Sequence, residues 1–574
     1  MRVVRVVAGT ISLVAVLGLV ACDSDTPSES SWVDPFCRDT RARVDSFMAV
    51  ARDRTRGMED ARHGGTAVVA GLADLPGGMN GFIAGEVMTV QHHQFVNLMT
   101  LVAFDEELNP RPYLAESWDV SPDGTELTFH IRRDVVWHDG VPTDAHDVAF
   151  TYRRVTDPET GFPNPGFWRR YEKGEAGMEV LDDHTIRFRL QPHAEFLDPW
   201  RTLAIMPEHL LRDVAPADLG RHPFGSECPV GNGPFVFQEH SPLDRWVFTA
   251  NPGFSPSLGG RPFLDRLIYR VVPDQETSLA ALLTGGVDVY LKVRPDQIEQ
   301  VSASPDLEPV VMDSRDFEFV GWNSRRPQLA DPRVRHALTL GTDREAIVAT
   351  LLEGYGRVAH TTVWPGHWAY EPGLVETPYD PAAAALLLEE AGWVDRDGDG
   401  VRENADGVRL SLGIRYPPGS VLRQSAGEII QAQLARIGVE VGLRPTETAV
   451  LMEVVTNPGS RDFDGLMLTW ANDFRLDDSD LLHSRNVDGD WGFAGIRSPA
   501  LDRYLDTLQV VLDREEALPL WREYQRLQEE IHPYMFLYFP QRLAGANRRL
   551  HGVVMDARGE LVSVRDWWID PEMR

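Results

Sequence analysis

The sequence predicts a soluble α/β protein of more than one domain. At 574 residues the chain exceeds what one hydrophobic core usually serves, and its length favours about two to four domains. Hydrophobic residues make up 43% and charged residues 25%, which is typical of a globular protein with ample core. Strand and helix patterns alternate along the chain. In residues 265–290, for example, a strand, a helix, a glycine pair and a second strand follow one another.

The N-terminus has the pattern of an export signal. Two arginines precede an apolar run at residues 11–20, which is too short to span a membrane. The run leads into Leu-Val-Ala-Cys, which resembles a bacterial lipobox, so we expect acyl chains on Cys22 to anchor the protein to a membrane. Asp23 resembles an inner-membrane retention signal. The expected location is therefore the outer face of the cytoplasmic membrane, in the periplasm or cell envelope.

Charge and cysteine content narrow the expected partners. The net charge of −31 opposes binding to nucleic acid, and solubility is a sufficient explanation for it. Export places Cys37 and Cys228 in an oxidising compartment, where they could form one disulfide. Their spacing does not show whether they meet, so this pairing stays open. The sequence has no CxxC pair and no cysteine–histidine cluster with zinc spacing, and we expect no cofactor.

The first elements follow from local patterns. Residues 23–31 are polar and predict a flexible tether. Residues 33–56 predict a short helix of unknown role. The body begins at residue 64, where TAVVAGL predicts a buried strand. A second strand with one buried face follows, and its apolar residues alternate with polar ones: Leu127, Phe129 and Ile131.

The segment after that strand predicts scaffold. Thr143 or Asp144 can cap a helix that carries Val148, Phe150 and Tyr152. His138-Asp139 could be read as a base with its orienting carboxylate, but its place beside a hairpin turn favours a structural role.

The later elements are predicted from turn residues, caps and periodicity. We expect a strand at 185–190 and a tight turn at 230–235. Next should come a helix with a capping box of Thr342 and Glu345, ended by Gly354, and a helix that starts at Pro381 and ends just before Gly392. Further helices are expected at 425–437 and 515–530, and a strand at 535–539 follows the last of them.

An ordered pattern across residues 114–154 resembles a known family. It reads L-A-E-S-W-x-V-S-x-D-G, F-x-I-R, V-x-W-H-D-G-x-P and D-V-x-F-x-x-R. This order is similar to the signature of the family 5 extracellular solute-binding proteins, which serve peptide-type ABC importers. The opening Gly-Gly-Thr at residue 64 and V-G-N-G-P-F at 230–235 also match, with Asn232 where threonine is usual.

The resemblance implies two α/β lobes that close on ligand about a hinge, as in the large type II periplasmic-binding proteins (cluster C) with an extra subdomain. It implies this division: signal peptide 1–21, lipidated tether and short helix 22–63, lobe one 64–95, signature subdomain 96–215, lobe one 216–318, lobe two 319–539 and the last part of lobe one 540–574.

The resemblance also implies a function and a set of ligand residues. The protein should be a monomer that captures dipeptides or oligopeptides and delivers them to an ABC permease and ATPase complex. In L-T-W-A-N-D-F, Asp473 matches the aspartate that receives the peptide ammonium group, and Trp470 would form an apolar wall. Trp322 and Asn323 match the F-x-x-W-N element and are the other expected ligand residues. A departure follows Asp473, because relatives commonly have Asp-Pro where this chain has Arg475-Leu476-Asp477-Asp478.

Alternatives for metal sites and for function remain. Asp395, Asp397 and Asp399 match the first half of a calcium loop, but Asp406 stands where the loop needs glutamate. His92-His93 could bind a metal, although an ordinary surface or cleft position is favoured. No catalytic motif is present, so we expect no enzyme. The same fold could bind a metal chelate, haem or an oligosaccharide. The remaining rivals are an envelope sensor and a lipid-anchored enzyme.

Overall fold

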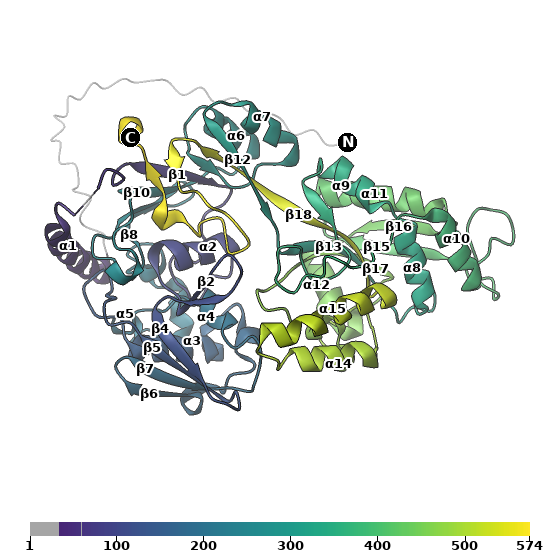
Figure 1. Cartoon of the computed structure of the whole chain (residues 1–574), viewed down its shortest axis with the longest axis horizontal. Coiled ribbons are helices and arrows are strands. Elements are labelled where there is room, and N and C mark those ends of the chain that lie inside the picture. Colours follow the sequence, from purple (N-terminus) through teal and green to yellow (C-terminus); the bar gives the residue numbers. More distant parts are fainter. Residues whose placement is uncertain (1–33, 59) are drawn as a thin grey trace, which may run out of the picture.

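The computed structural model describes residues 34–58 and 60–574. The expected signal peptide, the expected lipidation site at Cys22 and most of the expected tether lie outside the described residues. Figure 1 shows two bodies of mixed helices and strands joined by the long strand β18 (Tyr534–Asn547); we call them the first lobe and the second lobe. The predicted α/β class with two lobes is confirmed.

The first lobe combines segments from both ends of the chain. Its helices are α1 (Pro35–Thr55), α2 (Val87–His92), α6 (Gln275–Leu283) and α7 (Ile298–Ala303). Its strands are β1 (Thr66–Gly71), β8 (Phe235–Ser241), β9 (Arg245–Ala250), β10 (Arg266–Val271), β11 (Val289–Tyr290), β12 (Leu307–Asp313), β19 (Leu550–His551) and β20 (Trp568–Ile569). β1 runs parallel to β10 on one side and to β11 on the other. The strand–helix–strand unit predicted for residues 265–290 is therefore confirmed.

The signature subdomain is attached to the first lobe and lies below it in Figure 1. Its helices are α3 (Ala145–Thr156), α4 (Asp198–Thr202) and α5 (Glu208–Leu211). Its strands are β2 (Val102–Phe104), β3 (Pro110–Pro112), β4 (Ala115–Val120), β5 (Glu126–Ile131), β6 (Met178–Asp182) and β7 (Thr185–Arg189). β5 lies inside a sheet of order β4-β5-β7-β6, and its alternate residues Leu127, Phe129 and Ile131 are buried as predicted. Of the two expected caps of α3, Asp144 is the one used, in a capping box with Asp147.

The second lobe carries the remaining elements. Its strands are β13 (Asp316–Trp322), β14 (Gly356–Val358), β15 (Ser411–Tyr416), β16 (Glu440–Pro445) and β17 (Gly465–Ala471). Its helices are α8 (Pro332–Leu340), α9 (Arg344–Leu351), α10 (Pro381–Glu390), α11 (Val421–Ala435), α12 (Thr448–Thr456), α13 (Ser479–Leu482), α14 (Pro499–Leu508) and α15 (Arg514–Ile531).

β18 connects the lobes because it belongs to both halves of one sheet. Its first part pairs with β13 and with β14, as far as Pro540. From Gln541 onward it pairs with β12, and near its end also with β11. The chain therefore enters the second lobe between β12 and β13 and returns through β18. The exact residue boundaries of the seven-part division stay a prediction.

Two helix starts in the second lobe differ from the sequence prediction. α9 begins one residue later than a Thr342 cap requires, because the Asp343 carboxylate accepts the N–H of Ala346 at 2.9 Å. The Thr342 hydroxyl instead donates to the carbonyl of Leu338 at 2.9 Å, so the expected Thr342–Glu345 capping box was wrong. α11 begins earlier than predicted because Ser420 caps it.

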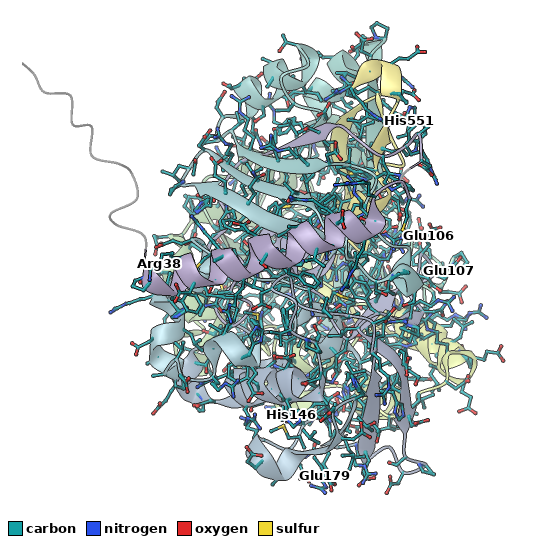
Figure 2. The ribbon with its side chains drawn as sticks, turned by 90° about the vertical axis from the view of Figure 1, so that its left-hand side faces the viewer. Arg38, Glu106, Glu107, His146, Glu179 and His551 are labelled. Carbon is teal, nitrogen blue, oxygen red and sulfur yellow. A yellow bond between two sulfur atoms is a disulfide. The ribbon has the colours of Figure 1, made fainter. Side chains whose placement is uncertain are left out.

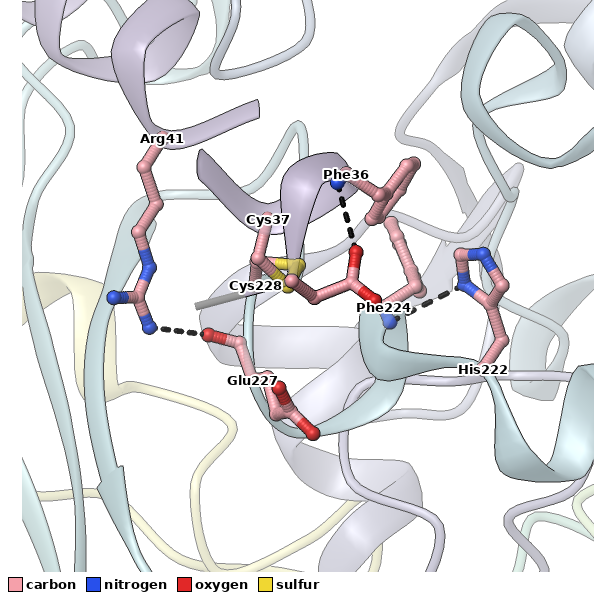
Figure 3. The surroundings of a disulfide bond; sticks show 8 residues. Phe36, Cys37, Arg41, His222, Phe224, Glu227 and Cys228 are labelled. Carbon is pink, nitrogen blue, oxygen red and sulfur yellow. Dashed lines mark hydrogen bonds between the residues drawn. A yellow bond between two sulfur atoms is a disulfide. The ribbon is translucent and has the colours of Figure 1, made fainter. Parts of the chain in front are cut away.

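A disulfide fastens helix α1 to the first lobe. Cys37, in the first turn of α1, is bonded to Cys228, with 5.3 Å between their Cα atoms and 191 residues between them in sequence (Figure 3). Arg41 adds a hydrogen bond of 2.7 Å to the carbonyl of Glu227. The open cysteine pairing is thus confirmed.

The N-terminal helix is also longer than the short one expected, because Asp34 caps it and Pro35 occupies its first turn. Figure 2 shows α1 lying across the outside of the body. Phe47 packs on Gly140, where an added Cβ would come within 2.6 Å of its ring. The helix therefore spans the junction of the first lobe and the signature subdomain.

His138 joins the signature subdomain to the turn at residues 230–235. Its Nε2–H donates to the carbonyl of Gly233 at 3.0 Å, and its Nδ1 accepts the N–H of Gly231 at 3.2 Å. Both ring nitrogens are occupied in this neutral form, and the side chain is buried. Burial lowers the pKa of His138 to about 4, which supports the structural role favoured by the sequence.

We expect His138 to make stability depend on pH. The unfolded chain takes up the proton near the ordinary pKa of 6.5, whereas the folded chain resists it down to about 4, so stability falls as pH falls through this window. One such histidine lowers the free energy of unfolding by about 2 kcal/mol on going from pH 7.5 to pH 5. Urea unfolding of the wild type and of His138→Gln at both pH values should show a smaller loss in the variant. Equal losses would contradict this account.

Candidate ligand-binding cleft

Three adjoining cavities lie where the signature subdomain and the first lobe face the second lobe. Their volumes are about 230, 240 and 190 Å³. Arg201 of α4 lines all three, and Asp473, just after β17, lines the first and the third. We call these cavities together the cleft.

The structure places both Asp473 and Trp470 in the lining of the first cavity, and their contact with ligand stays a prediction. The Asp473 side chain is 48% exposed, and its Oδ1 lies 3.7 Å from Nη2 of Arg201. Trp470 is half-buried and packs edge-to-face against Trp491, with 5.3 Å between ring centres. A carboxylate beside an aromatic wall therefore faces a space large enough for a small solute.

Trp322 and Asn323 do not lie in the cleft, and this corrects the sequence expectation. Trp322 is fully buried and fills the space left by Gly465, its neighbour on β17, where an added Cβ would meet the indole at 2.7 Å. Asn323 is buried, and its Nδ2 donates to the carbonyl of Phe463 at 3.1 Å. Both residues hold the sheet of the second lobe together, so neither is placed to touch ligand.

Sequence reasoning missed the arginines of the cleft. Arg201 and Arg315 both stack on the ring of Phe474, with their Cζ atoms 3.9 and 4.9 Å from its centre. Arg315 lies in the connection between β12 and β13. No motif marked either residue, because the three side chains come from distant segments. The only local hint was Phe474 itself, which follows Asp473.

Direct contacts join the two sides of the cleft. Arg169 of the signature subdomain forms an ion pair of 2.6 Å with Asp480 of the second lobe. The N–H of Ala194 donates to the carbonyl of Gln509 at 2.6 Å. Arg514 donates to Oδ1 of Asn109 at 2.7 Å. The structure therefore has its lobes in contact around the cleft.

Asp477 occupies the position where the sequence departs from the Asp-Pro of relatives. Nε2 of His193, across the cleft, lies 3.5 Å from its Oδ2. Burial acts to raise the pKa of Asp477, but the nearby His193 and hydrogen bonding from Ser479 outweigh it and hold the pKa well below the usual range. Nη2 of Arg169, also in the signature subdomain, lies 3.5 Å from the same carboxylate oxygen, so the departure provides an ion pair between the lobes.

Asp198 of α4 is a buried acid of the cleft. Burial, together with the charge of Asp473, raises its pKa to about 6, and Arg201 opposes this rise. Its carboxylate accepts the N–H of Arg475 at 3.2 Å. The acidic residues of the cleft thus include one half-exposed carboxylate that faces the cavities, Asp473, and buried carboxylates that contact protein.

The two candidate metal sites have protein partners. His92 and His93 are buried, not at a surface, and bind the carbonyls of Met88 and Gly78 at 2.8 and 2.7 Å. In the acidic loop, Asp399 forms an ion pair with Arg409, while ligand atoms of Asp395, Asp397 and Glu403 lie within 4.8 Å of one another.

The surroundings of this loop differ from an EF-hand, because α10 ends at Glu390 and the next helix begins at Val421. Calcium binding there stays an untested alternative, and no metal site is predicted. Among the described residues, no helix has the length and apolar character needed to cross a membrane.

Comparison with known proteins supports a solute-binding role for the cleft. The model of the family described as bacterial extracellular solute-binding proteins, family 5 Middle, matches residues 109–492. The oligopeptide-binding protein AppA of Bacillus subtilis (strain 168) is 29% identical over 486 residues, which cover 82% of this chain and 85% of AppA. The structure of AppA with a nonapeptide superimposes with a TM-score of 0.71 at 27% identity and covers 88% of this chain and 99% of that one.

Two further relatives show the range of ligands. Di/tripeptide-binding protein 2 of Pseudomonas aeruginosa (strain UCBPP-PA14) is 26% identical over 477 residues, or 79% of this chain and 85% of that protein. NikZ of Campylobacter jejuni, solved with Ni(L-His), gives a TM-score of 0.69 at 25% identity and covers 88% of this chain and 99% of that one. Because the family model spans more than half of the chain, the chain belongs to the family 5 bacterial extracellular solute-binding proteins.

Proposed function

We propose that this chain is the substrate-binding lipoprotein of an ABC importer, which captures peptides between its lobes and delivers them to a membrane permease. The observation that carries the proposal is Asp473, a half-exposed carboxylate beside Trp470 in the cleft. A peptide ammonium group there would make a charge-assisted hydrogen bond in a partly dry site. The relatives named for oligopeptides and for di/tripeptides support peptide as the cargo.

The permease would recognise the closed conformation of the two lobes. Among the residues that the structure describes, only the strand β18 and the β12–β13 connection cross between the lobes through the shared sheet, so bending is confined to a few residues. The contacts of Arg169 with Asp480 and of His193 with Asp477 form across the cleft. A peptide that bridges the same gap adds to these contacts and shifts the population toward the closed form.

Location and assembly are part of the same proposal. The protein would be anchored through Cys22 to the outer face of the cytoplasmic membrane and act there as a monomer. No bond of the cargo is made or broken, and the partners are the permease and its ATPase. The residue roles proposed are ammonium binding for Asp473 and an apolar wall for Trp470.

A thermal-shift screen followed by calorimetry tests the proposal. Peptides of different lengths, metal chelates and oligosaccharides are compared, since a ligand that binds only the native state raises Tm. Among binders, Asp473→Asn is expected to weaken affinity about 30- to 100-fold, because removing the charge of one partner loses about 2–3 kcal/mol. The matched control is Asp213→Asn, an exposed aspartate that does not line the cleft. If only chelates or sugars raise Tm, peptide is refuted as the cargo, whereas the solute-binding role of the fold stands.

A further inference from the structure

The wall of the cleft beside Asp473 holds two arginines on one aromatic ring. Arg201 comes from the signature subdomain, Arg315 from the β12–β13 connection, and Phe474 from the second lobe. A guanidinium group gains energy on an aromatic face, most when it is removed from water. Phe474 therefore fixes two like charges near each other, and an anion between them would relieve their repulsion.

Arg201 lacks the partners that a buried cation normally has. Its side chain is only 10% exposed, and its Nε is buried without a hydrogen-bond partner. Within the described chain its guanidinium donates no hydrogen bond, and the nearest carboxylate oxygen, on Asp473, is 3.7 Å away. Guanidinium has five N–H donors, and leaving them unused in a buried place is costly. A buried cation that lines all three cavities and has one weak carboxylate contact but no hydrogen bond from its guanidinium points to an anionic group of the ligand.

Arg315 adds to this positive charge. Its Nη1 donates to the carbonyl of Asn472 at 2.6 Å, which positions the group without neutralising it. Burial, together with the charge of Arg201, lowers the pKa of Arg315 to about 10, and the charge of Asp473 opposes this fall. At neutral pH the side chain therefore stays charged. Two cations and one aspartate face the same space.

The other arginines of the third cavity already have acidic partners. Arg542 forms ion pairs with Asp316 at 2.8 Å and Glu560 at 3.2 Å, and Arg558 pairs with Asp556. The excess positive charge is thus located at Arg201 and Arg315. The chain as a whole has a net charge of −31, whereas these two arginines make this wall of the cleft positive.

We propose that Arg201 and Arg315 bind a carboxylate of the peptide that lies close to its N-terminal ammonium group. The inference rests on the proposed function, because the ammonium is placed on Asp473. With 3.7 Å between Oδ1 of Asp473 and Nη2 of Arg201, and a hydrogen bond of about 2.8 Å on each side, an ammonium and a carboxylate bound in line with these two atoms lie about 9 Å apart. In an extended peptide one residue spans about 3.3–3.6 Å, so a carboxylate at this distance belongs to the first two residues.

Two sources supply such a carboxylate. One is the C-terminus of a dipeptide, and the other is an aspartate or glutamate at the first or second position of a longer peptide. In either case the ligand replaces the weak Asp473–Arg201 contact with two hydrogen-bonded ion pairs. The cleft would then select peptides whose opposite charges lie close together.

Isothermal titration calorimetry with four synthetic peptides tests this inference. Ala-Ala is compared with Ala-Ala-amide, and Asp-Ala-Ala-Ala-amide with Asn-Ala-Ala-Ala-amide. In the wild type we expect loss of the carboxylate to weaken binding at least about 10-fold in one pair or both. The pair that responds identifies the source. In Arg201→Gln and in Arg315→Gln the difference should fall below about 3-fold, whereas Arg212→Gln, an exposed arginine outside the cleft lining, should keep it.

The outcomes separate this inference from the proposed function. If peptides bind the wild type equally with and without the carboxylate, the carboxylate site is refuted and peptide binding stands. If none of the peptides binds and the screen also finds no peptide ligand, both proposals fall. The wild-type comparison needs no variant, so a variant that fails to fold does not remove the test. If both arginine variants still prefer the peptides that carry the carboxylate, then other residues bind that carboxylate and the inference is overturned.

Discussion

Replacing Trp322 with alanine is expected to lower the free energy of unfolding by about 3–5 kcal/mol and to leave peptide affinity unchanged. The side chain is fully buried in the second lobe between β13 and β17, against Gly465. Truncation leaves a cavity that the rigid sheet cannot collapse around, and it lies away from the cleft lining. Chemical unfolding and calorimetry on the same preparation measure both quantities.

Trp470 is the matched comparison, because it lies on the neighbouring strand but lines the cleft. Trp470→Ala should cost less stability, since the side chain is only half-buried, and should weaken peptide binding. Trp322→Ala is therefore expected to lose mainly stability, and Trp470→Ala mainly peptide affinity. If Trp322→Ala is as stable as the wild type but binds peptide more weakly, then Trp322 contacts the ligand and the present assignment is wrong.

Removing the disulfide is expected to lower the free energy of unfolding by about 2–5 kcal/mol. Cys37 and Cys228 are 191 residues apart, and a crosslink over such a long loop strongly restricts the unfolded chain. The double variant Cys37→Ala/Cys228→Ala is compared with the wild type in chemical unfolding, with and without reductant. The wild type should lose stability on reduction, and the variant should not respond.

The same variant should loosen α1. Without the bond, the helix is held by Phe47 on Gly140, by the hydrogen bond of Arg41 and by its partly buried apolar side chains. Limited proteolysis should therefore cut within residues 38–56 sooner than in the wild type. Equal stability and equal cutting in both proteins would show that packing alone holds α1.

Local elements could be predicted from the sequence because their causes are local. Alternating apolar residues define β5, and the Asp-Pro start and glycine end define α10, whose N-cap is Asp380. Errors stayed within a few residues where two capping side chains compete, as Asp343 and Thr342 do before α9. The family resemblance of residues 114–154 added the two-lobed fold, and the resemblance of residues 468–474 singled out Asp473 and Trp470.

Residue patterns and the family resemblance were enough to predict the α/β class, most elements, and Asp473 and Trp470, which line the cleft. Three features could be found only from the fold: Cys37 meets Cys228, Trp322 points into a core, and Arg201 and Arg315 share the ring of Phe474. The difference lies in the distance along the chain over which each cause acts. Periodicity and caps act over a few residues, whereas which face of a strand is covered, and which distant side chains meet, depend on how strands such as β13, β17 and β18 pair across the whole chain.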